Sequence, residues 1–199
     1  LVGHKTGGLA IVCVIVSCFF AAISGSGPAT VAALGAVMIP AMIEAGYGTE
    51  NSAALMSASG SIGIIIPPSI PFVVYSGISG VSVSRIFMAG IVPGILMGVA
   101  LAVAALIILK KNHQKVVQQK KASGAERWAA FKDALWGLLM PVIILGGIYG
   151  GFFTPTEAAA VAAVYGLIVG LFVYRTIKLK DLFDVFKEAA ISSGGIMLI

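Results

Sequence analysis

The sequence predicts an all-α, polytopic membrane protein, and three features of its 199 residues support this fold class. Hydrophobic residues make up 59% of the chain. Charged residues make up only 11%, whereas about 25% is typical of soluble domains. Several uncharged segments also reach the roughly 20 residues that a helix needs to cross the hydrocarbon core. This composition excludes a soluble enzyme, a nucleic-acid-binding domain and a disordered tail.

The chain ends and the two cysteines give further information about the class of protein. The chain opens with Leu1 rather than Met and closes on Ile199 inside an apolar run, so we expect it to be a piece of a longer protein. Cys13 and Cys18 lie in an uncharged apolar stretch and match neither a disulfide framework nor zinc-ligand spacing. We expect both cysteines to be small apolar packing residues.

The first uncharged segment, 6–43, is too long for one crossing and is interrupted near its centre. As one straight helix it would extend about 57 Å, well beyond a ~30 Å hydrocarbon core. The interruption at 24–28 has the sequence SGSGP, where glycine frees the backbone and proline removes a hydrogen-bond donor. The arms on either side, 9–22 and 29–43, are each short for a full crossing. We therefore predict a re-entrant helical hairpin.

The second uncharged segment, 51–84, contains a proline-rich break. A helix predicted over 52–66 runs into PPSIP at 67–71, and a shorter apolar stretch follows at 72–78. Three prolines in five residues prevent regular helical hydrogen bonding, so we predict one broken transmembrane helix made of two half-helices. Because unpaired backbone groups cost several kcal/mol in hydrocarbon, both breaks are expected to be buried in protein or to line a polar cavity.

Ordinary transmembrane helices are predicted over 86–109, 134–151 and 156–174. A tight turn joins the last two, and Thr154 or Thr156 is expected to cap the helix that follows it.

The basic residues predict the orientation of these crossings. Twelve of the 13 Lys and Arg residues fall on the side that holds Lys5, 110–133 and 175–188, and only Arg85 falls on the other. The positive-inside rule makes the basic side cytoplasmic. The basic linker is expected to be a solvated loop, with contact to anionic lipid headgroups as the alternative. Residues 175–188 mix charges with Leu and Phe, which predicts a helix along the cytoplasmic interface.

The predicted membrane interior offers neutral oxygen atoms rather than ionisable groups. Hydroxyl groups gather at Ser24, Ser26 and Thr30 in the first break, and at Ser57, Ser59, Ser61 and Ser69 around the second. In transporters with broken helices, such oxygens hold Na⁺, and exposed half-helix N-termini attract anionic groups. The alternative is that these small residues only allow close packing between helices.

The same breaks resemble a known family. The stretches FFAAISGSGPAT at 19–30, SGSIGIIIPPSIP at 59–71 and TPTEAA at 154–159 are similar, in order and spacing, to the large membrane (permease) subunit of tripartite ATP-independent periplasmic (TRAP) transporters. Shorter matches are IPAM at 39–42 and AGIVPG at 89–94. The chain resembles a central fragment of a DctM-like or SiaM-like subunit.

This resemblance implies a multi-pass protein of the bacterial inner membrane that is not an enzyme. It implies a sodium-coupled symporter that imports organic anions of the C4-dicarboxylate or sialic acid type, with Na⁺ as coupling ion and no other cofactor. The expected partners are a small membrane subunit, a periplasmic substrate-binding protein that delivers the anion, and membrane lipid, with no nucleic acid. The implied architecture is an inverted-repeat, elevator-type transporter.

The resemblance also divides the chain into three parts. Residues 1–85 are expected to form the first hairpin and discontinuous helix of a transport domain. Residues 86–133 would form a transmembrane helix and a basic cytoplasmic linker. Residues 134–199 would begin the second repeat, with two transmembrane helices, an interfacial helix and the start of a further helix.

Roles are assigned by position within the matching motifs. The hairpin tip is expected to face the second break and to share a Na⁺ with it. The expected Na⁺ ligands are Ser24, Gly25, Ser26, Gly63, Ile66, Pro67 and Ser69. The expected substrate contacts are Ser26, Gly27, Ser59 and Ser61. No catalytic residue is expected, and the second half of the site would lie outside this sequence.

Two other functions stay open at this point. An intramembrane serine hydrolase using Ser26 or Ser61 would need a His or Lys base at membrane depth, and the predicted spans contain neither. A non-transporting structural or channel-like subunit is the third hypothesis, and saturable, sodium-dependent uptake would exclude it.

Overall fold

The computed structural model describes residues 7–111 and 123–197, so Lys5 and the linker residues 112–122 lie outside it. Eight α-helices are present there, with no β-strand: α1 (Gly8–Ser24), α2 (Gly27–Glu44), α3 (Thr49–Gly60), α4 (Ile70–Ser79), α5 (Val83–Lys111), α6 (Gly124–Tyr149), α7 (Pro155–Ile168) and α8 (Leu182–Met197). Three short helical segments are η1 (Ser61–Ile64), η2 (Val169–Val173) and η3 (Leu179–Asp181). Four helical stretches are long and apolar enough to cross a membrane, namely α2, α5, α6 and Pro155–Val173. The predicted all-α, polytopic class is confirmed.

Helices α1 and α2 form a helical hairpin with a very short turn. Gly25 closes α1 in the left-handed region, with a φ of +62°, and its N–H donates to the carbonyl of Ala21 at 2.9 Å. Ser26 caps α2, and Pro28 lies in the first turn of that helix. Backbone N–H groups in the first turn have no carbonyl partner within the helix, so the missing N–H of proline costs no hydrogen bond there. Both arms are therefore longer than the ranges 9–22 and 29–43 predicted from the sequence.

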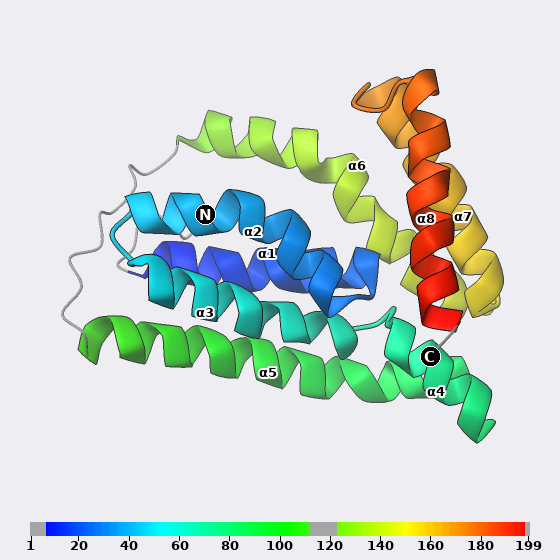
Figure 1. Cartoon of the computed structure of the whole chain (residues 1–199), viewed down its shortest axis with the longest axis horizontal. Helices are drawn as coiled ribbons and strands as arrows, with labels where there is room; N and C mark the ends of the chain where they lie inside the picture. The colour runs from blue at the N-terminus through cyan, green and yellow to red at the C-terminus, as the bar shows by residue number, and fades with distance from the viewer. Residues whose placement is uncertain (1–6, 112–122, 198–199) are drawn as a thin grey trace.

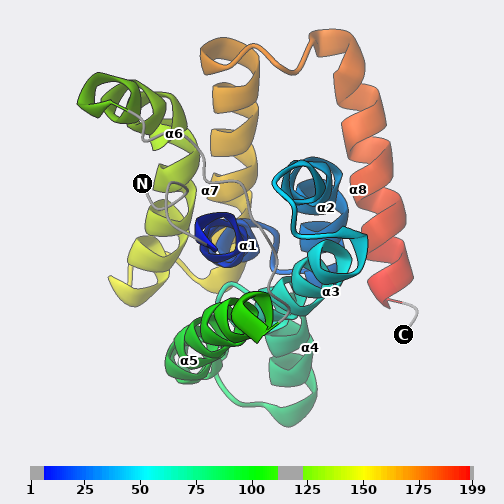
Figure 2. The same ribbon diagram turned by 90° about the vertical axis from the view of Figure 1, so that its left-hand side faces the viewer.

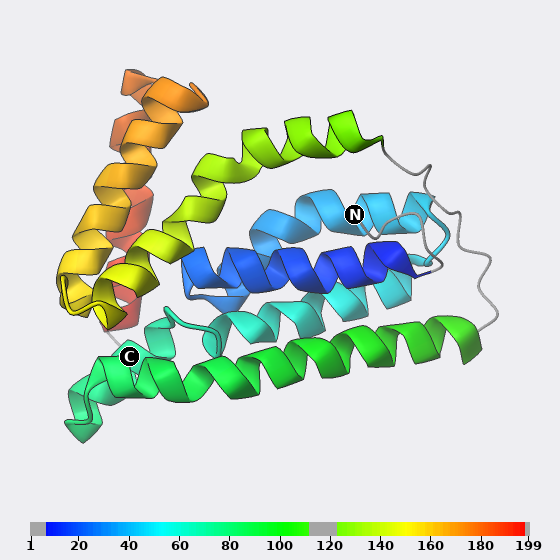
Figure 3. The same cartoon turned by 180° about the vertical axis from the view of Figure 1, so that it is seen from behind.

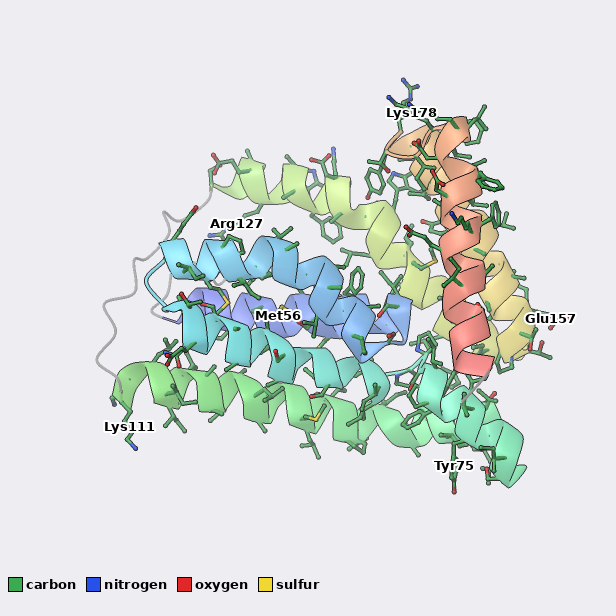
Figure 4. The ribbon with its side chains drawn as sticks, in the orientation of Figure 1. Met56, Tyr75, Lys111, Arg127, Glu157 and Lys178 are labelled. Atoms are coloured by element: carbon green, nitrogen blue, oxygen red, sulfur yellow. The ribbon has the colours of Figure 1, made fainter. Side chains whose placement is uncertain are left out.

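Helix α3 packs against both arms of the hairpin, and α5 covers α1 and α3 (Figures 1 and 2). The core of this unit contains the buried side chains of Cys13, Met42, Tyr47 and Met56. Figure 4 shows Met56 at the centre of these helices. The hydroxyl of Tyr47 accepts a hydrogen bond from the N–H of Ala10 at 3.3 Å, which joins the α2–α3 turn to the first turn of α1.

The α-helical part of the broken helix ends earlier than predicted. Helix α3 stops at Gly60, and the chain tightens into η1 before it unwinds. The physical reason is that Pro67 and Pro68 have no N–H to donate to the carbonyls four residues before them. The Pro67–Pro68 peptide bond is cis. Ser69 then caps α4, where its hydroxyl oxygen accepts from the N–H of Phe72 at 3.5 Å.

Three glycines spaced four residues apart let α5 approach its neighbours closely. A Cβ on Gly90 would lie 2.5 Å from the Ile65 carbonyl oxygen, and one on Gly94 would lie 2.6 Å from Cγ1 of Ile66. A Cβ on Gly98 would lie 3.3 Å from Sγ of Cys18 on α1. Gly90 and Gly94 therefore bring α5 against the unwound backbone, and Gly98 brings it against α1.

Helix α6 begins ten residues before the range predicted for it. Ser123 and Glu126 form a capping box that starts the helix at Gly124, within the region predicted to be a loop. Thr154, and not Thr156, caps α7 and forms a capping box with Glu157. Helix α6 bends along its length, and α7 and α8 run across the direction of α5 rather than along it (Figures 1 and 3).

The structure does not reproduce the helix predicted over 175–188. Residues 175–178 are non-helical, and η3 leads directly into α8, which continues to Met197. The N–H of Lys178 donates to Oδ2 of Asp181 at 2.9 Å, which places the helical start after Lys178. Since no helix-breaking residue follows until Gly194, one helix replaces the two predicted elements.

Replacing Gly90 by Ala is expected to destabilise the protein by about 1–3 kcal/mol, because the new methyl group would collide with the Ile65 carbonyl and the Phe72 ring. Gly146→Ala on α6 is the matched control, since a Cβ there meets no atom within 4 Å. Thermal unfolding in detergent measures both. Equal unfolding temperatures for the two variants would contradict the close packing of α5 on the break.

Candidate functional site

The two breaks in the helices meet directly. The carbonyl oxygen of Gly25, at the hairpin tip, accepts a hydrogen bond from the N–H of Ile70 at 3.0 Å. A Cβ on Gly25 would lie only 2.8 Å from the carbonyl oxygen of Pro68. Each break therefore provides backbone contacts for the other, which agrees with the position that the family resemblance implied for the hairpin tip relative to the Gly63–Ser69 break.

A second contact joins the start of α2 to the end of α3. A Cβ on Gly63 would lie 3.1 Å from both the carbonyl oxygen of Ser26 and Oγ1 of Thr30. Gly27 and Gly60 are also in close contact, since a Cβ on Gly27 would lie 3.0 Å from the Gly60 carbonyl oxygen. Glycines on both sides make this approach possible.

Hydroxyl groups surround the carbonyl of Ser26. Oγ1 of Thr30 donates to this carbonyl at 2.8 Å, and Oγ of Ser24 lies 3.3 Å from it. The Ser24 and Thr30 hydroxyls lie 3.1 Å apart. Thr30 is completely buried and was absent from the predicted ligand set. Its spacing of four residues from Ser26 was the available signal, because a helical hydroxyl commonly bonds the carbonyl one turn before it.

The unwound side of the junction is rich in unpaired carbonyl oxygens. The hydroxyl of Ser69 is buried and donates to the Ile64 carbonyl at 2.8 Å. The next four carbonyls, in residues 65–68, accept no hydrogen bond from any described residue. Free carbonyls in a broken transmembrane helix are suited to coordinating a hard cation.

A cavity of about 400 Å³ lies beside the junction. The hairpin tip contributes Ser24 and Gly25, and the second break contributes Pro68 and Ser69. The rest of the wall is apolar and comes from Ile23 of α1 and from α4, α5, α6 and α7. No charged side chain lines the cavity in the part of the chain that is described. The caps of α2 and α4, Ser26 and Ser69, place two helix N-termini at the junction, and their dipoles favour negative charge.

The structure brings together five of the predicted Na⁺ ligands: Ser24, Gly25, Ser26, Gly63 and Ser69. Ile66 lies on the opposite side of the unwound segment, where its side chain faces Gly94 of α5. Pro67 is buried between Ile66 and the cavity-lining Pro68.

The four predicted substrate contacts do not form one site. Ser26 and Gly27 lie at the junction, whereas Ser59 is buried beside Cys13 of α1 and its hydroxyl has no partner among the described residues. Ser61 is exposed, and its hydroxyl donates to the Ala58 carbonyl at 2.6 Å. Residues two positions apart point to different sides of a helix, so Ser59 and Ser61 cannot face the same ligand.

These observations define an all-α, polytopic membrane protein built around a helical hairpin and a broken helix that contact each other at their breaks. The family model described as "Tripartite ATP-independent periplasmic transporter, DctM component" matches residues 1–199. The chain therefore belongs to this family, which consists of transporter components and not of enzymes, and it is a multi-pass protein of the bacterial inner membrane.

Curated relatives agree with this assignment. The chain is 47% identical to the isethionate TRAP transporter permease protein DctMQ of Oleidesulfovibrio alaskensis over all of its length, which is 31% of that protein. It is 49% identical to the C4-dicarboxylate TRAP transporter large permease protein DctM of Pseudomonas aeruginosa, over 94% of the chain and 44% of the relative. It is 40% identical to the ectoine TRAP transporter large permease protein TeaC of Halomonas elongata, over 100% of the chain and 46% of the relative. The chain thus spans less than half of each of these proteins, from 31% to 46% of their length.

Gly25→Ala is expected to loosen the junction, because its methyl group would meet the Pro68 carbonyl and weaken the hydrogen bond from Ile70. Gly80→Ala is the matched control: Gly80 is also left-handed, with a φ of +72°, but has open space around it. Both variants carry a backbone cost of about 1–2 kcal/mol. Hydrogen–deuterium exchange should be faster at the Ile70 amide only in Gly25→Ala. Unchanged exchange there would contradict the observed contact.

Proposed function

We propose that this chain forms part of a sodium-coupled secondary transporter that imports organic anions. The observation that carries the proposal is the junction between the two breaks, where neutral oxygens gather and no described residue contributes a charged side chain to the cavity. Two interruptions of helical hydrogen bonding are costly in a membrane, and a shared ion would compensate for both. Membership of the family indicates that the chain is part of a transporter, and the neutral oxygens at the junction support a cation as the coupling ion.

The proposed Na⁺ site lies between the hairpin tip and the unwound segment. Ser24, Ser26 and Thr30 would supply oxygens from the tip. The carbonyls of Ile66, Pro67 and Pro68 and the hydroxyl of Ser69 would supply them from the break. Gly25 and Gly63 would permit the close approach of the two segments and would contribute backbone only. No cofactor other than this ion is proposed.

The proposed substrate is an anion bound in the cavity beside the ion. The N-terminus of α4, capped by Ser69, would face its negative group from the cavity wall, and the apolar wall would contact the remainder. Ser26 and Gly27, at the N-terminus of α2, would lie behind this wall at the junction and would reach the anion only through a local movement of the hairpin tip. A C4-dicarboxylate is favoured over sialic acid, because relatives named for C4-dicarboxylate are 49% and 51% identical to this chain. Further contacts would come from parts of the protein beyond this sequence.

The proposed partners are a small membrane subunit and a periplasmic binding protein that delivers the anion, within surrounding membrane lipid. We also propose an elevator-type movement of an inverted-repeat protein. In support, helices α1–α3 share buried clusters with α5, while α6 and α7 form a second cluster with Phe87 of α5, against which Phe72 of α4 packs. Residues 1–85 would then belong to the moving part, and 134–199 would begin the second repeat.

Removing single oxygens from the junction is expected to weaken sodium coupling. Ser24→Ala and Thr30→Val should each raise the Na⁺ concentration for half-maximal uptake about tenfold. Each variant removes one oxygen that would contact the ion, and the loss of one contact to a charge weakens binding by about this factor. Ser57→Ala, at an exposed position of α3, is the matched control and should behave as the wild type. Uptake into proteoliposomes, with the binding protein loaded with candidate anions, measures this. Uptake by the wild type that ignores the Na⁺ gradient would refute the proposal.

A further inference from the structure

Helix α6 bends in its middle part (Figures 1 and 3), and the sequence places Gly137 and Pro141 one turn apart there. Pro141 has no N–H for the carbonyl of Gly137, four residues before it, and a proline inside a helix commonly kinks it. A Cβ on Gly137 would meet no atom within 4 Å, so the space beside this turn is open. Residues 137–141 are therefore the part of α6 that is least able to resist a change of direction.

The two halves of α6 are held in different ways. After the bend, Ile144 and Ile148 are buried in one cluster with Phe87 of α5 and Ala158 of α7. Before the bend, every residue from 124 to 134 is exposed except the half-buried Arg127. Packing therefore fixes the second half of α6 but contributes little to the direction of the first.

Two tyrosine hydroxyls hold the turn that precedes the bend. The hydroxyl of Tyr165, on α7, donates to the carbonyl of Trp136 at 2.7 Å, and the hydroxyl of Tyr174, directly after η2, donates to the carbonyl of Asp133. Residues three apart lie on one face of a helix, so both bonds reach the same face of α6. Within residues 7–111 and 123–197, these are the side-chain hydrogen bonds that join α6 to another helix.

An irregular turn at the end of α7 makes the second bond possible. On a regular α-helix, side chains nine residues apart point in roughly opposite directions, about 180° from each other. In η2 the N–H of Tyr174 instead donates to the carbonyl of Val169, five residues before it, at 2.8 Å. Such a π turn contains an extra residue and changes the direction of the side chains that follow it. Tyr165 and Tyr174 consequently both reach α6.

We propose that Tyr165 and Tyr174 form a clamp that sets the angle of the bend in α6, with residues 137–141 as the hinge. While both hydroxyls are bound, the first half of α6 keeps one direction, and when they are released it pivots about Pro141. The chain from α5 enters α6 at this first half, so the angle affects how α5 is connected to α6 and α7. The clamp is a property of α6 and α7 and does not depend on the proposed ion or substrate sites.

Removing the hydroxyls tests the clamp. In the intact permease in lipid nanodiscs, Tyr165→Phe and Tyr174→Phe should each speed hydrogen–deuterium exchange of the Gly137 and Met140 amides about threefold, the effect of one hydrogen bond between membrane helices. These amides pair with the carbonyls of Asp133 and Trp136 in a regular helix, so they open when the first half pivots. The double variant should show exchange that is about tenfold faster.

Tyr149→Phe is the matched control on the same helix, because the Tyr149 hydroxyl donates to no residue in 7–111 or 123–197, and exchange should stay as in the wild type. Unchanged exchange in the double variant would overturn the proposal. An equal rise at the Met56 amide of α3 would also overturn it, since it would mean a general loosening of the fold rather than a hinge.

A distance measurement tests the hinge itself. Genetically encoded spin labels at Ala125 and Phe152, which are both exposed, lie near the start of α6 and just beyond its end, so their separation reports the angle of the bend. Pulsed electron paramagnetic resonance should give a narrow distance distribution for the wild type and Tyr149→Phe, and a broader one for the double variant. Equal widths in all three proteins would show that packing alone fixes the bend and would overturn the proposal. Neither measurement requires sodium or an anion, so failure here is separate from failure of the proposed transport.

Discussion

Unwound backbone within an apolar protein interior must find hydrogen-bond partners, and in this protein each interrupted helix provides them for the other. The Gly25 carbonyl accepts from the Ile70 amide, and the Ser69 hydroxyl satisfies a carbonyl that proline leaves free. Without the first contact, both the hairpin tip and the start of α4 would present unpaired groups. Glycine at positions 25 and 63 is required because any side chain there would separate the two backbones.

The packing of the remaining helices follows from this contact. Helix α5 approaches the break through Gly90 and Gly94, so the unwound segment lies between the hairpin on one side and α5 on the other. The carbonyls of 65–68, which accept no hydrogen bond from residues 7–111 or 123–197, are consequently held in place by packing. Oxygens fixed in this way would need little rearrangement to coordinate the cation proposed above.

The end of α1 separates two hollows of different chemistry. The cavity beside the junction has the start of α4 and two hydroxyls in its wall, whereas the hollow between α1 and α6 is lined by apolar side chains and Tyr174. Ile23 lines both hollows.

The sequence alone determined the positions of both breaks, because glycine and proline change the backbone wherever they occur, and it determined the membrane class from the lengths of uncharged segments. Local signals also mark helix starts: the Ser123 and Glu126 capping box is present in the sequence, within the range 110–133 that was predicted to be a solvated loop. Only the tertiary structure decided which hydroxyls face the junction, placing Thr30 there and turning Ser59 and Ser61 to other sides. The direction of a side chain depends on which helix packs against it, and that partner is distant in sequence.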